Sequence, residues 1–230
     1  MKRSIALGAA ALLALTLTNC GHADKSPNTG TDNKSSSAGH SGESSNATTS
    51  SAAGPPSASN YTSERFSIPF TVTLPASLKP QPTEDTGTFV TWESVSAGGK
   101  AVRFLQPVVV YRPGSSSPQA PPKDYLTYLR GQTSHGAKFA NAKTISVDGH
   151  ATTIMTATTT RALDGSLGCP TATTAADECF GLQTDLALRI AVIDLNGKTL
   201  LAWARTDSQD VNVPAFYAEF AGMLQSLKFR

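Results

Sequence analysis

The spacing of apolar residues along the chain predicts a domain built mostly of strands. Within residues 70–74 apolar side chains alternate with threonines, as in a strand buried on one face. Residues 88–95 and 102–111 predict two further strands, and the second is apolar enough at its end to lie in the middle of a sheet. Pro107 cannot donate a hydrogen bond to a neighbouring strand, so we expect a bulge or an unpaired stretch at this residue.

Two hairpins follow from the turn residues. The first runs from 143 to 161 around Asp148-Gly149, and the second runs from 185 to 206 around Asn196-Gly197. Asp-Gly and Asn-Gly suit a type I′ turn, because both central residues of that turn need a positive φ.

Two helices complete the pattern. The first is predicted over residues 121–135, with its prolines in the first turn. The second begins near Pro214, with Asn212 or Asp210 as its cap. Its apolar stripe consists of Phe216, Phe220, Met223, Leu224 and Leu227. A single stripe of this kind packs on a sheet. The expected fold is therefore α+β, a mainly antiparallel sheet with two packed helices, over residues 61–230.

Residues 21–60 differ sharply from this domain, since they contain no Val, Ile, Leu, Met, Phe, Trp, Tyr or Cys. They have no apolar surface to bury, so ordering them would lose entropy without compensation. We expect residues 20–60 to be a disordered Ser/Thr/Gly-rich linker. Its root-mean-square reach would be about 35 Å.

The N-terminus resembles a bacterial lipoprotein signal. Lys2 and Arg3 precede an apolar run from Ile5 to Leu17, 13 residues that are too short for a membrane span and suit a signal peptide. Leu17-Thr18-Asn19-Cys20 resembles the lipobox, in which cleavage precedes a cysteine that carries diacylglycerol. The resemblance implies a signal peptide over 1–19 and acylation of Cys20, with palmitate among the chains.

Asn19 departs from the lipobox pattern, which has Gly, Ala or Ser there. The alternative is an ordinary signal peptide cut after Ala23, which would discard Cys20 and release a secreted protein. Two acyl chains hold a protein stably on a membrane, so the lipoprotein would stay on the extracytoplasmic face of the cell membrane.

Charge excludes one class of partner. The chain has 19 Lys plus Arg and 17 Asp plus Glu. Removal of Lys2 and Arg3 with the signal peptide leaves 17 of each. A neutral chain without a basic run has no electrostatic attraction for nucleic acid, and only weak attraction for anionic lipid headgroups.

The chain has three cysteines, and two of them lie in the domain. With Cys20 acylated, Cys169 and Cys179 are left to pair, and an exported domain keeps its disulfides. We expect a disulfide that holds an insertion in the connection 162–180. A metal site or a redox-active pair is the weaker alternative, because CxxC spacing is missing.

The motifs of catalysis are missing or incomplete. Gly197-Lys198-Thr199 resembles the end of a phosphate-binding loop, but a strand is expected after it and Val192 occupies the position of the first glycine. His135 and His150 are the histidines of the domain, and loop carboxylates are usually solvated. The sequence thus predicts no enzyme, no cofactor and no metal.

The order of elements resembles the PsbP-like α/β/α sandwich, and within it the actinobacterial LpqN/LpqT-type lipoproteins. The resemblance covers about residues 64–230 and includes Leu74-Pro75 and the terminal Ser226-Leu227-Lys228-Phe229. It implies a non-enzymatic envelope protein that binds a partner.

Three functions stay open. The first is a non-catalytic domain that binds an unidentified envelope protein. The second is a carrier or sensor of a small apolar ligand, which requires a cavity between sheet and helix that involves Trp92 or Trp203. The third is an envelope hydrolase whose His135 or His150 would meet a carboxylate and a nucleophile in a cleft.

Overall fold

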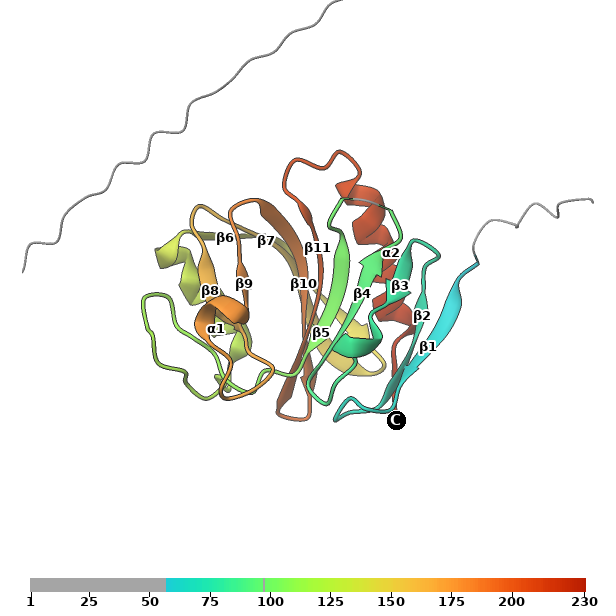
Figure 1. The fold of residues 1–230 in the computed structure, drawn as a ribbon, viewed down its shortest axis with the longest axis horizontal. Coiled ribbons are helices and arrows are strands. Elements are labelled where there is room, and N and C mark those ends of the chain that lie inside the picture. Colours follow the sequence, from blue (N-terminus) through green and yellow to red (C-terminus); the bar gives the residue numbers. More distant parts are fainter. Residues whose placement is uncertain (1–56, 97) are drawn as a thin grey trace, which may run out of the picture. The chain divides into compact units, whose positions relative to one another are not determined.

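The main sheet has seven strands in the order β3-β4-β5-β11-β10-β7-β6, and all its pairs are antiparallel (Figure 1). The computed structural model describes residues 57–96 and 98–230. The predicted signal peptide, Cys20 and most of the predicted linker lie outside the described residues. The strands are β3 (Leu78–Pro80), β4 (Phe89–Ser94), β5 (Ala101–Leu105), β6 (Ala137–Val147), β7 (His150–Thr159), β10 (Leu186–Leu195) and β11 (Lys198–Asp207).

Two smaller sheets flank the main one. They consist of β1 (Ser59–Ser63), β2 (Phe70–Leu74) and β12 (Lys228–Phe229), and of β8 (Leu163–Gly168) with β9 (Phe180–Leu182). The predicted alternation in β2 is confirmed, since its apolar residues are buried. β1 begins at Ser59, before the expected domain start at Tyr61. Ser59 and Asn60 pair with β2 through their backbones, which a polar composition does not prevent.

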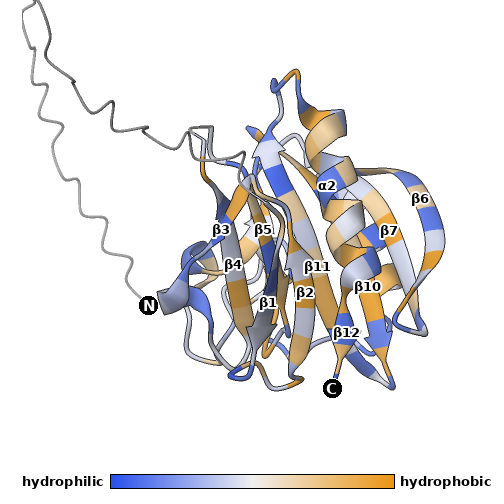
Figure 2. Ribbon diagram, turned by 90° about the vertical axis from the view of Figure 1, so that its right-hand side faces the viewer, coloured by the Kyte–Doolittle hydropathy of each residue, from blue (hydrophilic) through white to orange (hydrophobic). Residues whose placement is uncertain are grey.

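α2 (Val213–Ser226) confirms the predicted C-terminal helix. All five residues of the stripe are buried, and Figure 2 shows the helix lying along one face of the sheet. Asn212 is the N-cap residue, and its backbone N–H donates to Asp210 Oδ1 at 2.7 Å. The helix shares a core with the side chains of Trp92, Phe104 and Ile193.

α1 (Tyr125–Gly131) is shorter than predicted and starts later. Asp124 caps it by accepting a hydrogen bond from Thr127 N at 2.9 Å, so the prolines of the expected first turn lie before the helix. A carboxylate satisfies a free N–H at a helix start, and this decides where the helix begins. A 3₁₀ turn, η2 (Gln132–His135), continues the helix, and Gly136 ends it at φ 98°.

Tyr125 and Leu129 of α1 are buried against the face of the sheet opposite α2. Each face of the sheet therefore carries one helix, and the predicted fold class is confirmed. Two further 3₁₀ turns are η1 (Pro82–Glu84) and η3 (Ala176–Glu178). In the described ranges 57–96 and 98–230, no helix has the length and apolar character needed to cross a bilayer.

The predicted strand 102–111 ends at Leu105 in the structure. Pro107 interrupts it, as its missing N–H requires, and the residues beyond form two isolated bridges, Val109 with Cys169 and Val110 with Gln119. The predicted central position holds for β5, which lies between β4 and β11.

Both predicted turns are confirmed by positive φ angles. Asp148 and Gly149 have φ of 48° and 84°, and Asn196 and Gly197 have φ of 57° and 87°. β6 begins at Ala137, before the predicted residue 143, and a bulge between Ala140 and Lys143 interrupts its pairing.

Asp210 joins the α2 start to the β4–β5 connection through an ion pair with Lys100 at 2.8 Å. Hydrogen bonds from Lys100 and from Asn212 N lower the pKa of Asp210 from 3.8 to about 2. A depressed pKa stabilises the fold above pH 3.8, and this stability is lost as pH falls towards 2. We expect Asp210→Asn to flatten acid unfolding between pH 4 and 2, measured as urea midpoints against wild type. An equal pH slope in both proteins would contradict the role of this pair.

Candidate functional site

Strand register places two arginines on the face of the sheet away from α2. Arg103 of β5 lies opposite Thr91 of β4 and Trp203 of β11, and Arg205 lies opposite Ala101. Residues directly opposite each other, and residues two apart along one strand, share a face. Because the side chain of Ala101 is only a methyl group, it leaves space on the sheet surface beside Arg205.

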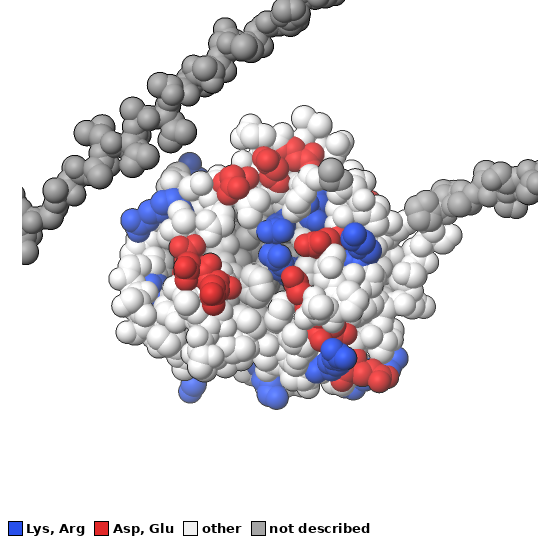
Figure 3. All heavy atoms as spheres, viewed as in Figure 1, with Lys and Arg blue, Asp and Glu red and all other residues white. Residues whose placement is uncertain are grey.

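β9 forms the wall beside these arginines. The guanidinium carbon of Arg103 lies 5.2 Å from the ring centre of Phe180, a cation–π contact. Phe180 also meets Trp203 edge to face, with the ring centres 5.2 Å apart. In Figure 3 blue Lys and Arg atoms gather near the middle of this face, with red carboxylates on both sides.

The arginine hollow is the cavity of about 150 Å³ lined by Arg103, Phe180, Gly181, Leu188, Trp203 and Arg205. Among residues 57–96 and 98–230, no carboxylate lies at ion-pair distance from its two guanidinium groups. Within the described part of the chain the ion pairs are Lys100–Asp210 and Lys228–Asp148.

The guanidinium groups are also poorly hydrogen-bonded. Arg103 Nε donates to Thr91 Oγ1 at 3.3 Å, whereas Arg205 Nε is buried with no hydrogen-bond partner among the described residues. Burial, and then the charge of Arg205, lower the pKa of Arg103 to about 10, while Glu84 and Glu93 act in the opposite direction. The hollow therefore holds positive charge that an incoming anion would stabilise.

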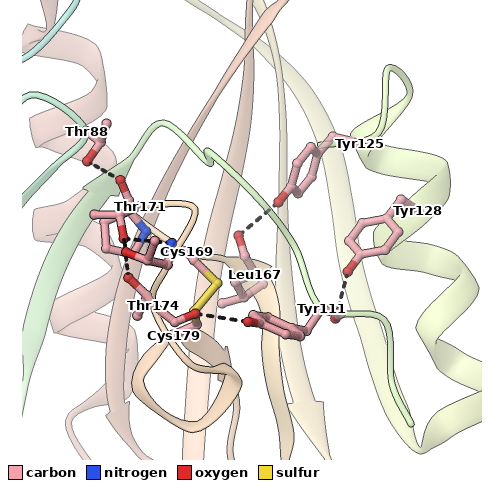
Figure 4. Close-up of a disulfide and its surroundings, with 11 residues drawn as sticks. Thr88, Tyr111, Tyr125, Tyr128, Leu167, Cys169, Thr171, Thr174 and Cys179 are labelled. Atoms are coloured by element: carbon pink, nitrogen blue, oxygen red, sulfur yellow. Dashed lines mark hydrogen bonds between the residues drawn. A yellow bond between two sulfur atoms is a disulfide. The ribbon is translucent and has the colours of Figure 1, made fainter. Parts of the chain in front are cut away.

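The disulfide between Cys169 and Cys179 is present in the structure, with the paired sulfur atoms 2.00 Å apart. Figure 4 shows how hydrogen bonds fasten the surrounding segment: Tyr111 Oη donates to Thr174 O at 3.1 Å, and Thr88 Oγ1 donates to Pro170 O at 2.8 Å. Phe180 directly follows Cys179, so the disulfide holds the strand that forms the wall of the arginine hollow.

The segment 162–180 is more than an irregular insertion, because it contains β8 and η3. Gly181 explains how closely β9 approaches β8. A Cβ atom at Gly181 would lie 2.2 Å from Leu163 O, which no side chain permits. Glycine at this position therefore lets β9 lie close to β8, and the neighbouring Phe180 contacts Arg103.

The two histidines of the domain are engaged with other groups. His135 Nδ1 lies 3.0 Å from a guanidinium nitrogen of Arg161, and His150 Nδ1 lies 3.1 Å from Asp194 O. Neither ring has a hydrogen bond to a carboxylate side chain among residues 57–96 and 98–230. The same residues contain no group of three or more His, Cys, Asp or Glu placed to hold a metal ion.

A second depression of about 510 Å³ lies beside α1, lined in part by Arg112, Tyr128 and His135. It continues towards Arg161, but that guanidinium already donates to His135 O at 2.7 Å. The second depression also has a buried polar atom without a partner among the described residues, the uncharged Gln132 Oε1. The arginine hollow differs because the group left without a partner there, Arg205 Nε, belongs to a charged guanidinium.

The tryptophans do not line a cavity under α2. Trp92 is fully buried, and its ring packs edge to face against Tyr61 and Phe104 at 5.3 and 4.9 Å. Side chains fill the described space between α2 and the sheet, and Trp203 lines the arginine hollow instead. Around Trp92, the described residues therefore leave no cavity of the kind that the apolar-ligand hypothesis requires.

Sequence reasoning missed Arg103 and Arg205. Each is a charged residue in a strand with a largely apolar middle, in Val102-Arg103-Phe104 and Ala204-Arg205-Thr206. That pattern is a usable signal, since a charge in a central strand needs a partner or a function. The sequence does not show which arginines lie side by side, because this depends on the strand order of the sheet.

No protein-family model matches the sequence, and no curated protein matches it. Similar solved structures include the Ran-binding protein Mog1p of Saccharomyces cerevisiae, with TM-score 0.43 and 10% identity over 75% of this chain and 96% of that one. They also include cyanobacterial PsbP (CyanoP) of Synechocystis, with TM-score 0.42 and 12% identity over 78% and 96%. Likeness at this level carries no conclusion about function, and the LpqN/LpqT resemblance stays a prediction.

Proposed function

We propose that this protein is a membrane-anchored lipoprotein on the extracytoplasmic face of the cell membrane. Its domain would be a non-catalytic binding domain that takes an anionic group of its partner into the arginine hollow. The observation that carries the binding role is the half-buried guanidinium of Arg205, whose Nε has no hydrogen-bond partner among the described residues.

An unpartnered buried donor is unfavourable for folding. Leaving such a group without a hydrogen bond costs about 1–3 kcal/mol, and more when the group is charged. Two neighbouring guanidinium groups add repulsion. An anion that enters the hollow would offset the repulsion between the two guanidinium groups.

The anchor is supported by the sequence before the domain. A 13-residue apolar run ends at Leu17, Cys20 follows, and 21–60 supplies the expected tether. Because Cys169 and Cys179 bond to each other, Cys20 is the cysteine left for acylation.

One experiment in intact cells tests both parts of the proposal. Wild type and the variants Cys20→Ser and Arg205→Met are expressed at equal levels, fractionated and crosslinked. We expect Cys20→Ser to move from the membrane pellet to the soluble fraction, because it removes the acyl chains that are the proposed anchor. We expect Arg205→Met to stay in the pellet and to lose the crosslinked adduct seen in wild type.

Arg189→Met is the matched control. Arg189 is a half-buried arginine of β10 opposite Ala204, so its register places it on the other face of the sheet. It should keep both the membrane fraction and the adduct. A Cys20→Ser protein that still sediments with membranes would overturn the anchor. An adduct that persists in Arg205→Met would overturn the binding site.

A further inference from the structure

The shape of the arginine pair points to a planar anion. Arg103 and Arg205 project from adjacent strands on one face, offset by one diagonal step of the ladder. The ring of Phe180 packs against one side of the Arg103 guanidinium. A guanidinium presents parallel N–H donors that match the two oxygens of a carboxylate, and such bidentate pairs are the stronger ion pairs.

Nearby charges favour a single negative charge. Glu84 and Glu93 both act on Arg103 without forming an ion pair with it. Glu93 lies opposite Ala101, which lies opposite Arg205, so register places Glu93 on the same face. Its carboxylate is held by Gln81 Nε2 at 2.8 Å. A phosphate ester carries about −1.5 to −2 and would be repelled more by these glutamates than a carboxylate with charge −1.

The remaining walls are apolar. Phe180, Trp203 and Leu188 line the hollow beside the arginines. The volume of about 150 Å³ equals that of about five water molecules at 30 Å³ each. This space holds one carboxylate with a small apolar group, and the rest of a larger ligand would lie outside on the sheet face.

We propose that the arginine hollow binds a carboxylate attached to an apolar carbon group, with the carboxylate on Arg103 and Arg205 and the carbon group against Trp203 and Leu188. This inference rests on the proposed binding function and names the chemical class of its ligand. The carboxylate comes either from a small organic acid or from the end of a peptide.

The test uses the mature chain with Cys20→Ser and three probes of similar ring size: benzoate, benzamide and phenyl phosphate. Isothermal titration calorimetry measures each dissociation constant. We expect benzoate to bind at about 1 mM, a normal strength for a ligand of this size. Phenyl phosphate should bind at least tenfold more weakly, and neutral benzamide should show no saturation.

Arg205→Met and Arg189→Met locate the site. We expect Arg205→Met to weaken benzoate about tenfold or more, the loss of one charge-assisted hydrogen bond. Arg189→Met should stay within about twofold of the parent. Arg205→Met should also melt at or above the parent temperature without ligand, since a buried charge is replaced by an apolar side chain; this melt shows that the variant is folded.

A peptide that ends in a free phenylalanine carboxylate, compared with its C-terminal amide, assigns the source. If the peptide binds more tightly than benzoate, the natural carboxylate is the end of a peptide. If the peptide binds more weakly than benzoate, the natural carboxylate belongs to a small organic acid. Both results support a carboxylate ligand. Tighter binding of phenyl phosphate would overturn the carboxylate while leaving an anion-binding domain. The absence of saturable binding by all probes to folded protein would overturn the site itself, as would equal losses in both arginine variants.

Discussion

Replacing Phe220 by alanine is expected to lower the free energy of unfolding by about 3–5 kcal/mol. Phe220 is fully buried in the middle of α2, within the core that the helix shares with the main sheet. Removing its ring deletes apolar contact area and leaves a cavity that close-packed neighbours fill only in part. Urea unfolding followed by circular dichroism measures this change, and the denaturation midpoint should fall without a large change in slope.

Val211→Ala is the control for this prediction. Val211 stands just before α2 with 88% of its surface exposed, so its replacement should change stability by less than about 0.5 kcal/mol. If Phe220→Ala and Val211→Ala behaved alike, α2 would not be packed on the sheet as described.

Removal of the disulfide is expected to lower the free energy of unfolding by about 2–3 kcal/mol. The bond closes a loop with a sequence separation of 10 residues, and it stabilises the fold mainly by restricting the unfolded chain. The double variant Cys169→Ser/Cys179→Ser and reduced wild type should show the same loss in urea unfolding.

This change also bears on the arginine hollow. Cys179 directly precedes Phe180, whose ring contacts the Arg103 guanidinium, so a looser β9 should weaken benzoate binding as well as stability. Adding reductant to the double variant is the control and should have no effect. Unchanged stability of wild type after full reduction, verified by mass spectrometry of the thiols, would contradict the prediction.

The elements that were predicted well are those whose pattern is local. The α2 stripe is a set of side chains on one helix, and the Asn196-Gly197 turn depends on the φ angles of two adjacent residues. Such features need no knowledge of distant residues. The same holds for Pro107, whose missing N–H cannot donate to a neighbouring strand.

The predictions that were wrong concern boundaries. α1 begins later than predicted, because the Asp124 carboxylate caps the helix and the prolines lie before this cap. β6 extends back to Ala137, because backbone pairing with β7 continues through residues whose side chains are polar. In both cases hydrogen bonds to the backbone decided where the element begins.

The sequence by itself determined the α+β class, the two hairpins, the amphipathic C-terminal helix and the pairing expected of Cys169 and Cys179, and it supplies the reasons to propose an acylated Cys20. The tertiary structure alone decided that Arg103 and Arg205 lie together beside Phe180. The two arginines are distant in the chain, and the pairing of β5 with β11 brings them to one face. The position of β9 then places Phe180 against Arg103. The binding hollow thus depends on long-range strand pairing, which local periodicity does not encode.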